Sequence, residues 1–440
     1  MPRHAAWTLL RSGRLTALRE VDRVARARGL DARDTALLRR LVGTEVRRRG
    51  TLRALVQAFT RRKPSPDLAA HLRLGFVQLF FLDQVPPHAA VSETVRATAD
   101  TLGPAKGRFA NAVLREALRA RREERSGDPR RDLVDREVSF ERPVFRDPQA
   151  HPLLWAEDAL SIPGALMKRW NKRYGDERAQ ALARTYMGEP DLSLRVVRGD
   201  ADQACQALAQ MGLDPRRGAH ERVLLVPAAE TSTVVHAAPF EAGEWTVQGE
   251  TSLRAAELLG SADGERILDL CAAPGGKTTL LAEGGARVLA VDRSPRRLLR
   301  VVEAARRLGV LARVRCVASD GARVLRRIAF DAALVDVPCS NTGVLGARPE
   351  ARWRFGPATQ AALVELQGRL LGEAARLVRP GGRLVYSTCS IEPEENARQV
   401  QAFLDGAAGW TLAREHEALA DAPGGPGPVD GGYAALLERS

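Results

Sequence analysis

The spacing of apolar residues divides the chain into a helical part and a part in which strands and helices alternate. Up to about residue 125, apolar residues recur at intervals of three and four, as in Leu37, Leu38 and Leu41, with arginines between them. This spacing predicts helices, among them one over 71–82 and another that begins near His88. We therefore expect an all-α bundle over residues 1–125.

The pattern changes twice further along the chain. Residues 126–180 begin as a highly charged stretch without apolar periodicity and end in helical spacing, which predicts a linker with helices. Residues 181–245 contain short strands around one helix, so we expect a small α+β unit. In 246–440 the apolar strands RILDL, RVLAVD, RVRCVAS, AALVDV and RLVYSTC alternate with helices. That alternation predicts a doubly wound, mainly parallel sheet, a Rossmann-like α/β domain.

Three successive strands of this predicted sheet end in a small-residue loop or an acid. RILDL leads into Pro274-Gly275-Gly276, where small residues let a ligand approach the backbone closely. The spacing is neither GxGxxG nor that of a Walker loop, which makes a dinucleotide or a triphosphate less favoured. The next strands end at Asp292, which could accept both hydroxyls of a ribose, and at Asp320, which could meet an adenine amino group. Each acid alone could be a helix N-cap, but the three strand ends together favour an adenosyl ligand.

Two further strands carry cysteines to the same edge of the sheet. Strand 332–337 delivers Asp336 and, just beyond it, Cys339, and strand 383–388 delivers Cys389. A free cysteine is most often a small core residue, which is a sufficient account of Cys205 and Cys316. Cys389 stands between hydroxyl residues, which favours a reactive thiol.

The charge and cysteine content of the chain bear on its binding partner and its cellular location. The formal net charge of +13 suits a polyanion such as RNA, although a basic enzyme without such a partner would look the same. The arginines that could contact phosphates, or equally form a solvated helix face, are Arg11, Arg14, Arg47, Arg48 and Arg49. The number of cysteines is odd, which argues against a disulfide framework. None of them forms a CxxC pair, which argues against a structural zinc site. Without a signal-peptide pattern or an apolar run long enough to span a membrane, we expect a cytoplasmic protein.

Six stretches resemble known families. DLCAAPGGKT, DVPCSNTGVL followed by RPEARWR, and YSTCSIEPEEN resemble the RNA 5-methylcytosine methyltransferases. LGFVQLFFLDQVPPHAAVSETV with FANAVLR resembles the NusB-type RNA-binding domain. The pairing of the two is similar to the bacterial 16S ribosomal RNA cytosine methyltransferases of the RsmB, Sun or Fmu type. The resemblance covers most of the chain and is weakest over 122–160.

This resemblance implies a function with named site residues. The protein would transfer a methyl group from S-adenosylmethionine to C5 of a cytosine in RNA, and 16S ribosomal RNA is the expected substrate. Cys389 would attack C6, Cys339 would assist breakdown of the adduct, and Asp336 would bind the base edge. The cofactor would be held by Asp292, Asp320, Asp336 and the loop residues Cys271, Ala272, Ala273, Pro274, Gly275, Gly276 and Lys277. We expect a monomer that uses no metal and no membrane.

The resemblance has departures and the function has alternatives. VQGET stands at 247–251 where the family usually shows VQD, and 187–195 lacks a common asparagine, which puts local substrate contacts in doubt. In the related DNA enzymes the cysteine that follows proline attacks, so Cys339 remains an alternative nucleophile. An RNA-binding factor without catalysis would not need both cysteines. An amine or protein methyltransferase commonly has Asn/Asp-Pro-Pro-aromatic at 336–339, whereas this chain has Asp-Val-Pro-Cys.

Overall fold

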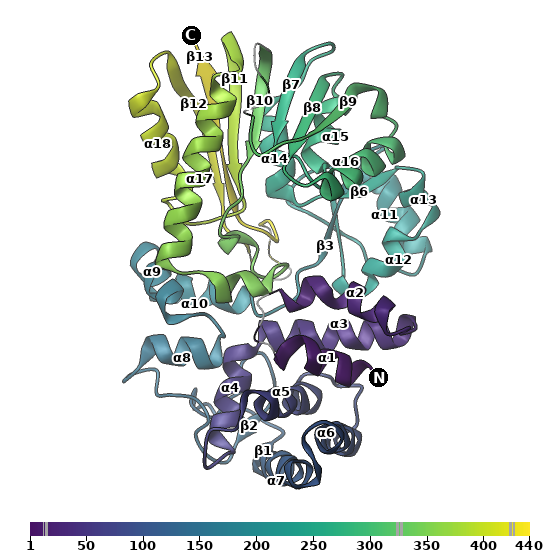
Figure 1. The fold of residues 1–440 in the computed structure, drawn as a ribbon, viewed down its shortest axis with the longest axis vertical. Helices are drawn as coiled ribbons and strands as arrows, with labels where there is room; N and C mark the ends of the chain where they lie inside the picture. The colour runs from purple at the N-terminus through teal and green to yellow at the C-terminus, as the bar shows by residue number, and fades with distance from the viewer. Residues whose placement is uncertain (12, 14–15, 323–324, 326–328, 422–424, 426) are drawn as a thin grey trace. The chain divides into compact units, whose positions relative to one another are not determined.

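The chain folds into two compact units. The computed structural model describes residues 1–11, 13, 16–322, 325, 329–421, 425 and 427–440 (Figure 1). The first unit comprises Met1–Met187 together with Pro349–Arg354, and the second comprises Gly188–Arg348 and Phe355–Ser440.

The first unit is built almost wholly of helices. They are α1 (Pro2–Arg11), α2 (Val21–Ala27), α3 (Ala32–Arg47), α4 (Arg49–Ala58), α5 (Pro66–Phe80), α6 (Pro87–Leu102), α7 (Pro104–Ala120), α8 (Pro152–Ala159), α9 (Gly164–Tyr174) and α10 (Asp176–Thr185), with the short helices η1 (Ala17–Glu20) and η5 (Pro349–Arg354). The predicted helix over 71–82 is the second part of α5, which begins earlier because Ser65 caps it and Pro66 stands in its first turn. Leu38, Leu52 and Phe76 are fully buried in the core, so the three-and-four spacing marks the inner faces as expected.

The charged stretch that we expected to begin a linker packs into the first unit. Arg121–Arg122 (β1) pairs antiparallel with Ser139–Phe140 (β2). Leu133 and Phe140 are both fully buried. The carboxylate of Asp132 accepts hydrogen bonds from two backbone amides and a hydroxyl of the loop before it. Local acids and carbonyls thus satisfy the polar groups, and a few large apolar side chains anchor the segment without any helical periodicity.

Three of the arginines considered as phosphate contacts are not available at the surface. Arg48 is buried, where it donates to the carbonyl of Val134 and pairs with Asp135. Arg49 is buried against Glu45, which also binds Arg73. Arg47 is buried as well. These three side chains do not form a solvated helix face, because the run from the end of α3 to the start of α4 is buried.

The other two candidate arginines are Arg11 and Arg14. Arg11 is partly exposed and pairs with Asp67 while its guanidinium lies 4.4 Å from the ring centroid of Trp7. It therefore already has intramolecular partners. Arg14 falls outside the described residues.

Residues 349–354 contribute a buried cation to the first unit. The side chain of Arg352 is fully buried and donates to the carbonyls of Arg47, Ser161 and Tyr186 at 3.3, 3.3 and 2.7 Å. A single guanidinium thereby satisfies carbonyls from three separate segments, because its donors spread in a planar fork.

We expect Arg352→Leu to lower the free energy of unfolding of the first unit by about 3 kcal/mol, because buried carbonyls lose their donor. Differential scanning calorimetry of the full chain measures this. The matched control is Arg39→Leu, which removes an exposed pair with Asp22 and should cost less than about 1 kcal/mol. Equal effects of the two substitutions would contradict the assignment.

The second unit contains a large, mostly parallel sheet. In the part of the chain that the structure describes its strand order is β12-β13-β11-β10-β7-β8-β9. The strands are β7 (Arg266–Leu270), β8 (Arg287–Asp292), β9 (Val314–Ala318), β10 (Phe330–Asp336), β11 (Val378–Thr388), β12 (Trp410–Ala418) and β13 (Gly432–Arg439). Strands β7 to β11 pair in parallel, whereas β13 runs antiparallel to both β11 and β12. This confirms the predicted α/β class.

Helices cover both faces of this sheet (Figure 1). On one face α14 (Glu250–Leu259), α15 (Gly276–Glu283) and α16 (Pro295–Arg307) share a core with the strands. On the other face α17 (Pro357–Ala375) and α18 (Ala397–Gly406) do so. A strand buried on both faces needs apolar residues at nearly every position, which explains continuous runs such as AALV in β10. The short helix η3 (Leu311–Arg313) precedes β9, and η4 (Thr342–Val344) follows β10.

A small antiparallel sheet precedes the large one in the chain. Its order is β4-β5-β3-β6, formed by β3 (Leu192–Val196), β4 (Arg216–Arg217), β5 (Val223–Val226) and β6 (Trp245–Val247). Helix α11 (Ala201–Gln210) packs on it around the buried Leu208 and Trp245. The short helices η2 (Ala228–Glu230), α12 (Thr231–Val235) and α13 (Ala238–Glu241) lie in the connection between β5 and β6.

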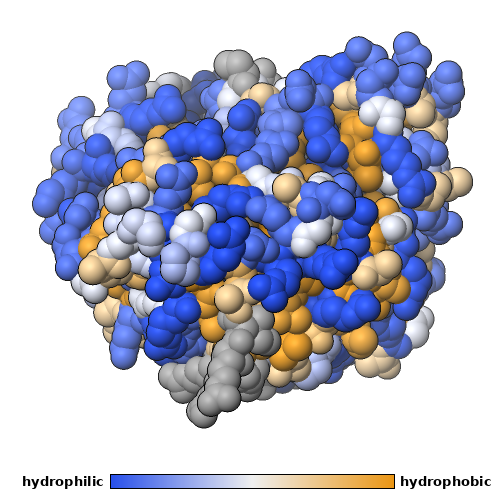
Figure 2. Space-filling view, turned by 90° about the horizontal axis from the view of Figure 1, so that it is seen from above, coloured by the Kyte–Doolittle hydropathy of each residue, from blue (hydrophilic) through white to orange (hydrophobic). Residues whose placement is uncertain are grey.

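The surface seen in Figure 2 is mainly hydrophilic, with smaller apolar areas between the polar side chains. Across the described ranges, no helix has both the length and the apolarity that crossing a membrane requires.

Candidate active site

The strand ends that carry the motifs meet at one edge of the large sheet. The register places Asp336 of β10 beside Ser387 of β11, and Val335 beside Leu270 at the end of β7. Parallel strands all end on the same side, and ligands of open α/β sheets bind there. A cavity of about 520 Å³ opens at this edge. The expected site residues that line it are Ala272, Pro274, Gly276, Lys277, Asp336 and Cys389.

Two thiols face each other at the ends of β10 and β11. The Sγ atoms of Cys339 and Cys389 are 3.1 Å apart. Cys389 is half-buried and lines the cavity, whereas Cys339 is buried behind it. Asn341 lies in the left-handed region at φ 62°, and its side-chain NH2 group donates a hydrogen bond to the carbonyl of Cys339. Its side-chain oxygen accepts a hydrogen bond from Arg348. This compact loop holds the two sulfur atoms in contact.

The environment separates the acidities of the two thiols. The hydrogen bond from Cys339 lowers the pKa of Cys389 despite its burial, and the positive charge of Arg348 acts in the same direction. The pKa of Cys339 is raised well above its usual value by that same bond and by burial. Of the two thiols, Cys389 therefore loses its proton more readily than Cys339.

A half-buried ion pair lies at the same cavity as the Cys389 thiol. Nζ of Lys277 lies 2.8 Å from Oδ2 of Asp336, and the hydroxyl of Ser387 donates to Oδ1 of Asp336 at 2.9 Å. Burial alone would lower the pKa of Lys277, but the Asp336 carboxylate outweighs it, so this pKa is raised. Lys277 is therefore a fixed positive charge that pairs with the Asp336 carboxylate at the cavity that Cys389 also lines.

The loop after β7 is shaped for close approach. Cys271 adopts a positive φ of 66°, and Gly275 caps α15 with φ 110°. A Cβ at Gly275 would lie 3.0 Å from the Cα of Val301, so a side chain there would press α16 away. Burial raises the pKa of Cys271 to about 12, which keeps this thiol protonated and unreactive. The glycine of the motif therefore allows the backbone conformation of this loop and its close packing against α16.

Of the two acids expected to bind an adenosyl group, one is held inside the fold and one is not. Asp292, at the end of β8, is buried and accepts from the backbone amides of Ala273 and Ser294. It also pairs with Arg297 at 3.2 Å. Asp320 is exposed and lies 3.6 Å from a guanidinium nitrogen of Arg369. Neither acid lines the 520 Å³ cavity.

Sequence reasoning missed several residues that build this site. The buried carboxylate of Glu395 accepts from the amide of Ser340, the side chain of Gln367 and the hydroxyl of Ser390. It therefore ties the loop after Cys339 to the loop after Cys389. Gln248 and Asp430 also line the cavity. The acidic run at 392–395 was a visible signal, but its role depends on contacts between distant segments.

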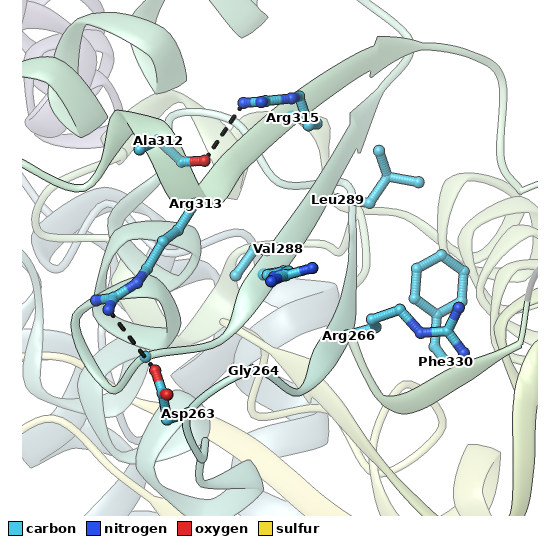
Figure 3. A pocket seen from close by; sticks show the side chains of 11 residues that line it. Asp263, Gly264, Arg266, Val288, Leu289, Ala312, Arg313, Arg315 and Phe330 are labelled. Carbon is cyan, nitrogen blue, oxygen red and sulfur yellow. Dashed lines mark hydrogen bonds and ion pairs between the residues drawn. The ribbon is translucent and has the colours of Figure 1, made fainter.

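A second hollow lies at the opposite, amino-terminal edge of the parallel strands. It has a volume of about 570 Å³ and is lined by Arg266, Arg287, Arg313 and Arg315. Arg313 pairs with Asp263, and Arg315 donates to the carbonyl of Ala312 (Figure 3). Its lining includes no thiol and none of the expected site residues. The chemistry-bearing groups therefore belong to the other edge.

The fold and this strand edge define a class, the methyltransferases with a doubly wound α/β domain. Residues 256–423 match the family profile described as 16S rRNA methyltransferase RsmB/F, and residues 10–119 match the NusB family. The chain is 32% identical over 402 residues to the probable ribosomal RNA small subunit methyltransferase B of a Synechocystis species, covering 89% of this chain and 85% of the relative. It is 35% identical over 411 residues to the ribosomal RNA small subunit methyltransferase B of Xylella fastidiosa, covering 90% and 86%. The chain belongs to the RsmB/F family of 16S ribosomal RNA methyltransferases.

Solved structures agree on the fold. The crystal structure of PH0851 has a TM-score of 0.75 at 23% identity and covers 100% of this chain and 99% of that one. NSun6 from Pyrococcus horikoshii, crystallised with SFG, has a TM-score of 0.54 at 21% identity, covering 63% of this chain and 98% of that one.

Proposed function

We propose that the protein transfers a methyl group from S-adenosylmethionine to C5 of a cytosine in 16S ribosomal RNA through a covalent bond between Cys389 and C6 of the base. The observation that carries the proposal is the pair of sulfur atoms 3.1 Å apart at the strand edge, of which one has a lowered and the other a raised pKa. A thiolate beside a protonated thiol and a carboxylate suits nucleophilic addition to an electron-poor ring.

The residues at this edge fit an adenosyl cofactor. The loop after β7 brings backbone close to the cavity, and we assign the ribose hydroxyls to the Asp292 carboxylate at the end of β8. Residues 271–277 would hold the rest of the cofactor. The exposed Asp320 would meet its adenine. The bound cofactor supplies an electrophilic methyl group on a sulfonium.

The first step assigned to this chain is addition to the base. The thiolate of Cys389 forms a bond to C6, the C5–C6 double bond opens, and the electron pair makes C5 nucleophilic towards the methyl group. Asp336, which pairs with Lys277, would orient the base edge through the exocyclic amino group of the cytosine. The target base must be unpaired or flipped out of a helix for the thiolate to reach C6.

The second step releases the product. A base removes the proton on C5, the double bond re-forms, and the bond from C6 to Cys389 breaks to return the thiolate. We assign the base to Cys339. Its raised pKa stems first from its hydrogen bond to Cys389, which weakens once that sulfur is bonded to carbon. Cys339 can then lose its own proton to water and accept the one from C5.

Bisulfite sequencing of 16S ribosomal RNA from cells with and without the gene tests the function. We expect one cytosine to remain unconverted only when the gene is present. Loss of that signal in cells that carry Cys389→Ala would tie it to catalysis. An unchanged RNA pattern would reject the proposed substrate, and a signal that survives Cys389→Ala would reject the assigned nucleophile.

Asp292→Ala should weaken binding of S-adenosylhomocysteine about tenfold, because buried ribose hydroxyls would lose a charged acceptor. Isothermal titration calorimetry measures this. Asp331→Ala is the matched control, since that acid lies at the start of β10 and binds Arg379. If the Asp292 variant folds and binds as tightly as the wild type, Asp292 does not touch the cofactor.

A further inference from the structure

Three buried polar atoms have no hydrogen-bond partner among the described residues and share the 520 Å³ cavity. They are Nε2 of Gln248, Oδ1 of Asp269 and Oδ1 of Asp430. Gln248 is 4% exposed and Asp269 is 1% exposed, so water does not readily replace the missing partners. Because buried polar groups are nearly always paired, one free donor and two free acceptors in one cavity indicate a ligand with both kinds of group.

The free donor of Gln248 is oriented by neighbours from outside the motifs. Arg195, fully buried in β3 of the small sheet, donates from Nε to Oε1 of Gln248 at 2.7 Å. Glu283, at the end of α15, holds the other guanidinium nitrogens of Arg195 at 2.6 and 2.9 Å. Since arginine can only donate, Oε1 must face Arg195 and the NH2 group of Gln248 must face away from it.

That donor lies at the beginning of α15. A Cβ built on Gly276, the first residue of the helix, would be 3.4 Å from the carboxamide carbon of Gln248 and 3.7 Å from Nε2. The amino end of a helix carries unpaired backbone N–H groups and a partial positive charge. The cofactor side of the cavity therefore offers two independent sources of donors to one anionic group.

The free acceptor of Asp430 occupies space left by a glycine. A Cβ at Gly249 would lie 2.3 Å from Oδ2 of Asp430, so the carboxylate sits where a side chain at 249 would start. Thr251, at the start of α14, holds this carboxylate through hydrogen bonds from its side chain and its backbone. Oδ1 has no partner among the described residues, and Asp430 lines the cavity. The carboxylate thus comes from the loop before β13, beside the position where VQGET departs from the pattern VQD.

We propose that Gln248 and Asp430 bind the amino-acid end of the cofactor, with Gln248 donating to its α-carboxylate and Asp430 accepting from its α-ammonium. The proposal rests on the proposed function, because it requires S-adenosylmethionine as the ligand. The free donor at the start of the helix matches a carboxylate, and the free carboxylate of Asp430 matches an ammonium. An α-amino acid group carries both charges. Asp269 is the weaker acceptor at neutral pH, because burial raises its pKa to about 7, compared with about 6 for Asp430.

Arg195 then acts as a positioning residue. It touches no ligand in this arrangement but fixes which end of the Gln248 amide faces the cavity. The small sheet would in this way contribute to the cofactor pocket.

Three nucleosides of graded structure test the proposal on the full-length chain by calorimetry. S-adenosylhomocysteine carries both charged groups, its decarboxylated analogue keeps only the ammonium, and 5′-methylthioadenosine has neither. We expect Gln248→Glu, which places a carboxylate where the donor was, to weaken S-adenosylhomocysteine about tenfold or more and to leave the other two unchanged within about twofold. Asp430→Asn should weaken both amine-bearing ligands about tenfold and spare 5′-methylthioadenosine.

The controls separate this inference from the proposed function. Gln401→Glu and Asp405→Asn make the same chemical changes on the exposed side of α18 and should alter no affinity. Wild-type protein that binds none of the three nucleosides would reject the proposed function itself. Wild-type binding with equal losses for all three ligands in the variants would mean a collapsed pocket and would overturn the direct contacts. Unchanged affinities with a raised KM for RNA would place Gln248 and Asp430 on the RNA instead.

Discussion

Replacing Cys389 with alanine should abolish methyl transfer, with turnover lower by about 10⁴-fold or more, the scale on which a catalytic nucleophile is lost. No covalent complex with RNA should form, because the remaining thiol at Cys339 is buried and does not line the cavity. The measurement uses an unmodified 16S ribosomal RNA transcript, radiolabelled S-adenosylmethionine and denaturing electrophoresis. Cys205→Ala, in α11, is the matched control and should retain full activity.

Replacing Cys339 with alanine should give the opposite picture on the gel. Addition and methyl transfer need only Cys389, so the protein should become joined to RNA and stall, because the base that removes the C5 proton is missing. Turnover should fall by about 10²-fold or more while the covalent complex accumulates. If instead Cys339→Ala gives no complex and Cys389→Ala accumulates one, the two roles are exchanged. Full methylation by both variants would reject covalent catalysis.

The hydrogen bond between the thiols adds a pH dependence to this prediction. Addition requires the Cys389 thiolate, so the rate of complex formation rises as the pH increases through the pKa of Cys389. Cys339 donates the bond that lowers this pKa, so Cys339→Ala should raise it. The pH profile of complex formation in Cys339→Ala should therefore lie at higher pH than the wild-type profile. For the wild type, the rate of single-turnover methylation measures the same addition step. A shift to lower pH would contradict the assigned donor.

Asp336→Asn should lower turnover by about 10²- to 10³-fold, the usual loss when a group that stabilises charge is removed from a closed site. The carboxylate pairs with Lys277 at 2.8 Å and accepts from Ser387, so the substitution also leaves the Lys277 ammonium without this counter-charge. Steady-state kinetics with the transcript measures the effect. Most of it should appear in kcat, because the proposed interaction strengthens as the ring gains charge.

Two comparisons make this prediction specific. Asp405→Asn on α18 makes the same change at an exposed site and should have no effect. Lys277→Met should lower turnover to a similar extent as Asp336→Asn, and the double variant should lose little more, because the two groups act as one unit. Full additivity would show that the ion pair seen at this edge does not operate in catalysis.

The sequence by itself determined the order of the elements and the strand ends that carry chemistry. Strands β7 and β8 coincide with the runs RILDL and RVLAVD, because strands buried on both faces must be apolar throughout. Since parallel strands end on one side, Asp336 and Cys389 had to lie at the same edge of the sheet, where they line one cavity. The helices of residues 1–125 were likewise predicted from apolar residues at intervals of three and four. Strand β12, by contrast, was not predicted, because its residues are largely exposed and polar.

Only the tertiary structure decided how individual side chains are used. The difference in pKa between Cys339 and Cys389 arises from a bond across 50 residues of chain, which no local pattern encodes. The arginines at 47–49 looked like a phosphate-binding run, yet burial and ion pairing inside the first unit withdraw Arg48 and Arg49 from solvent. Local sequence sets backbone preference and burial periodicity, whereas charge, hydrogen bonding and acidity depend on which distant segments come into contact.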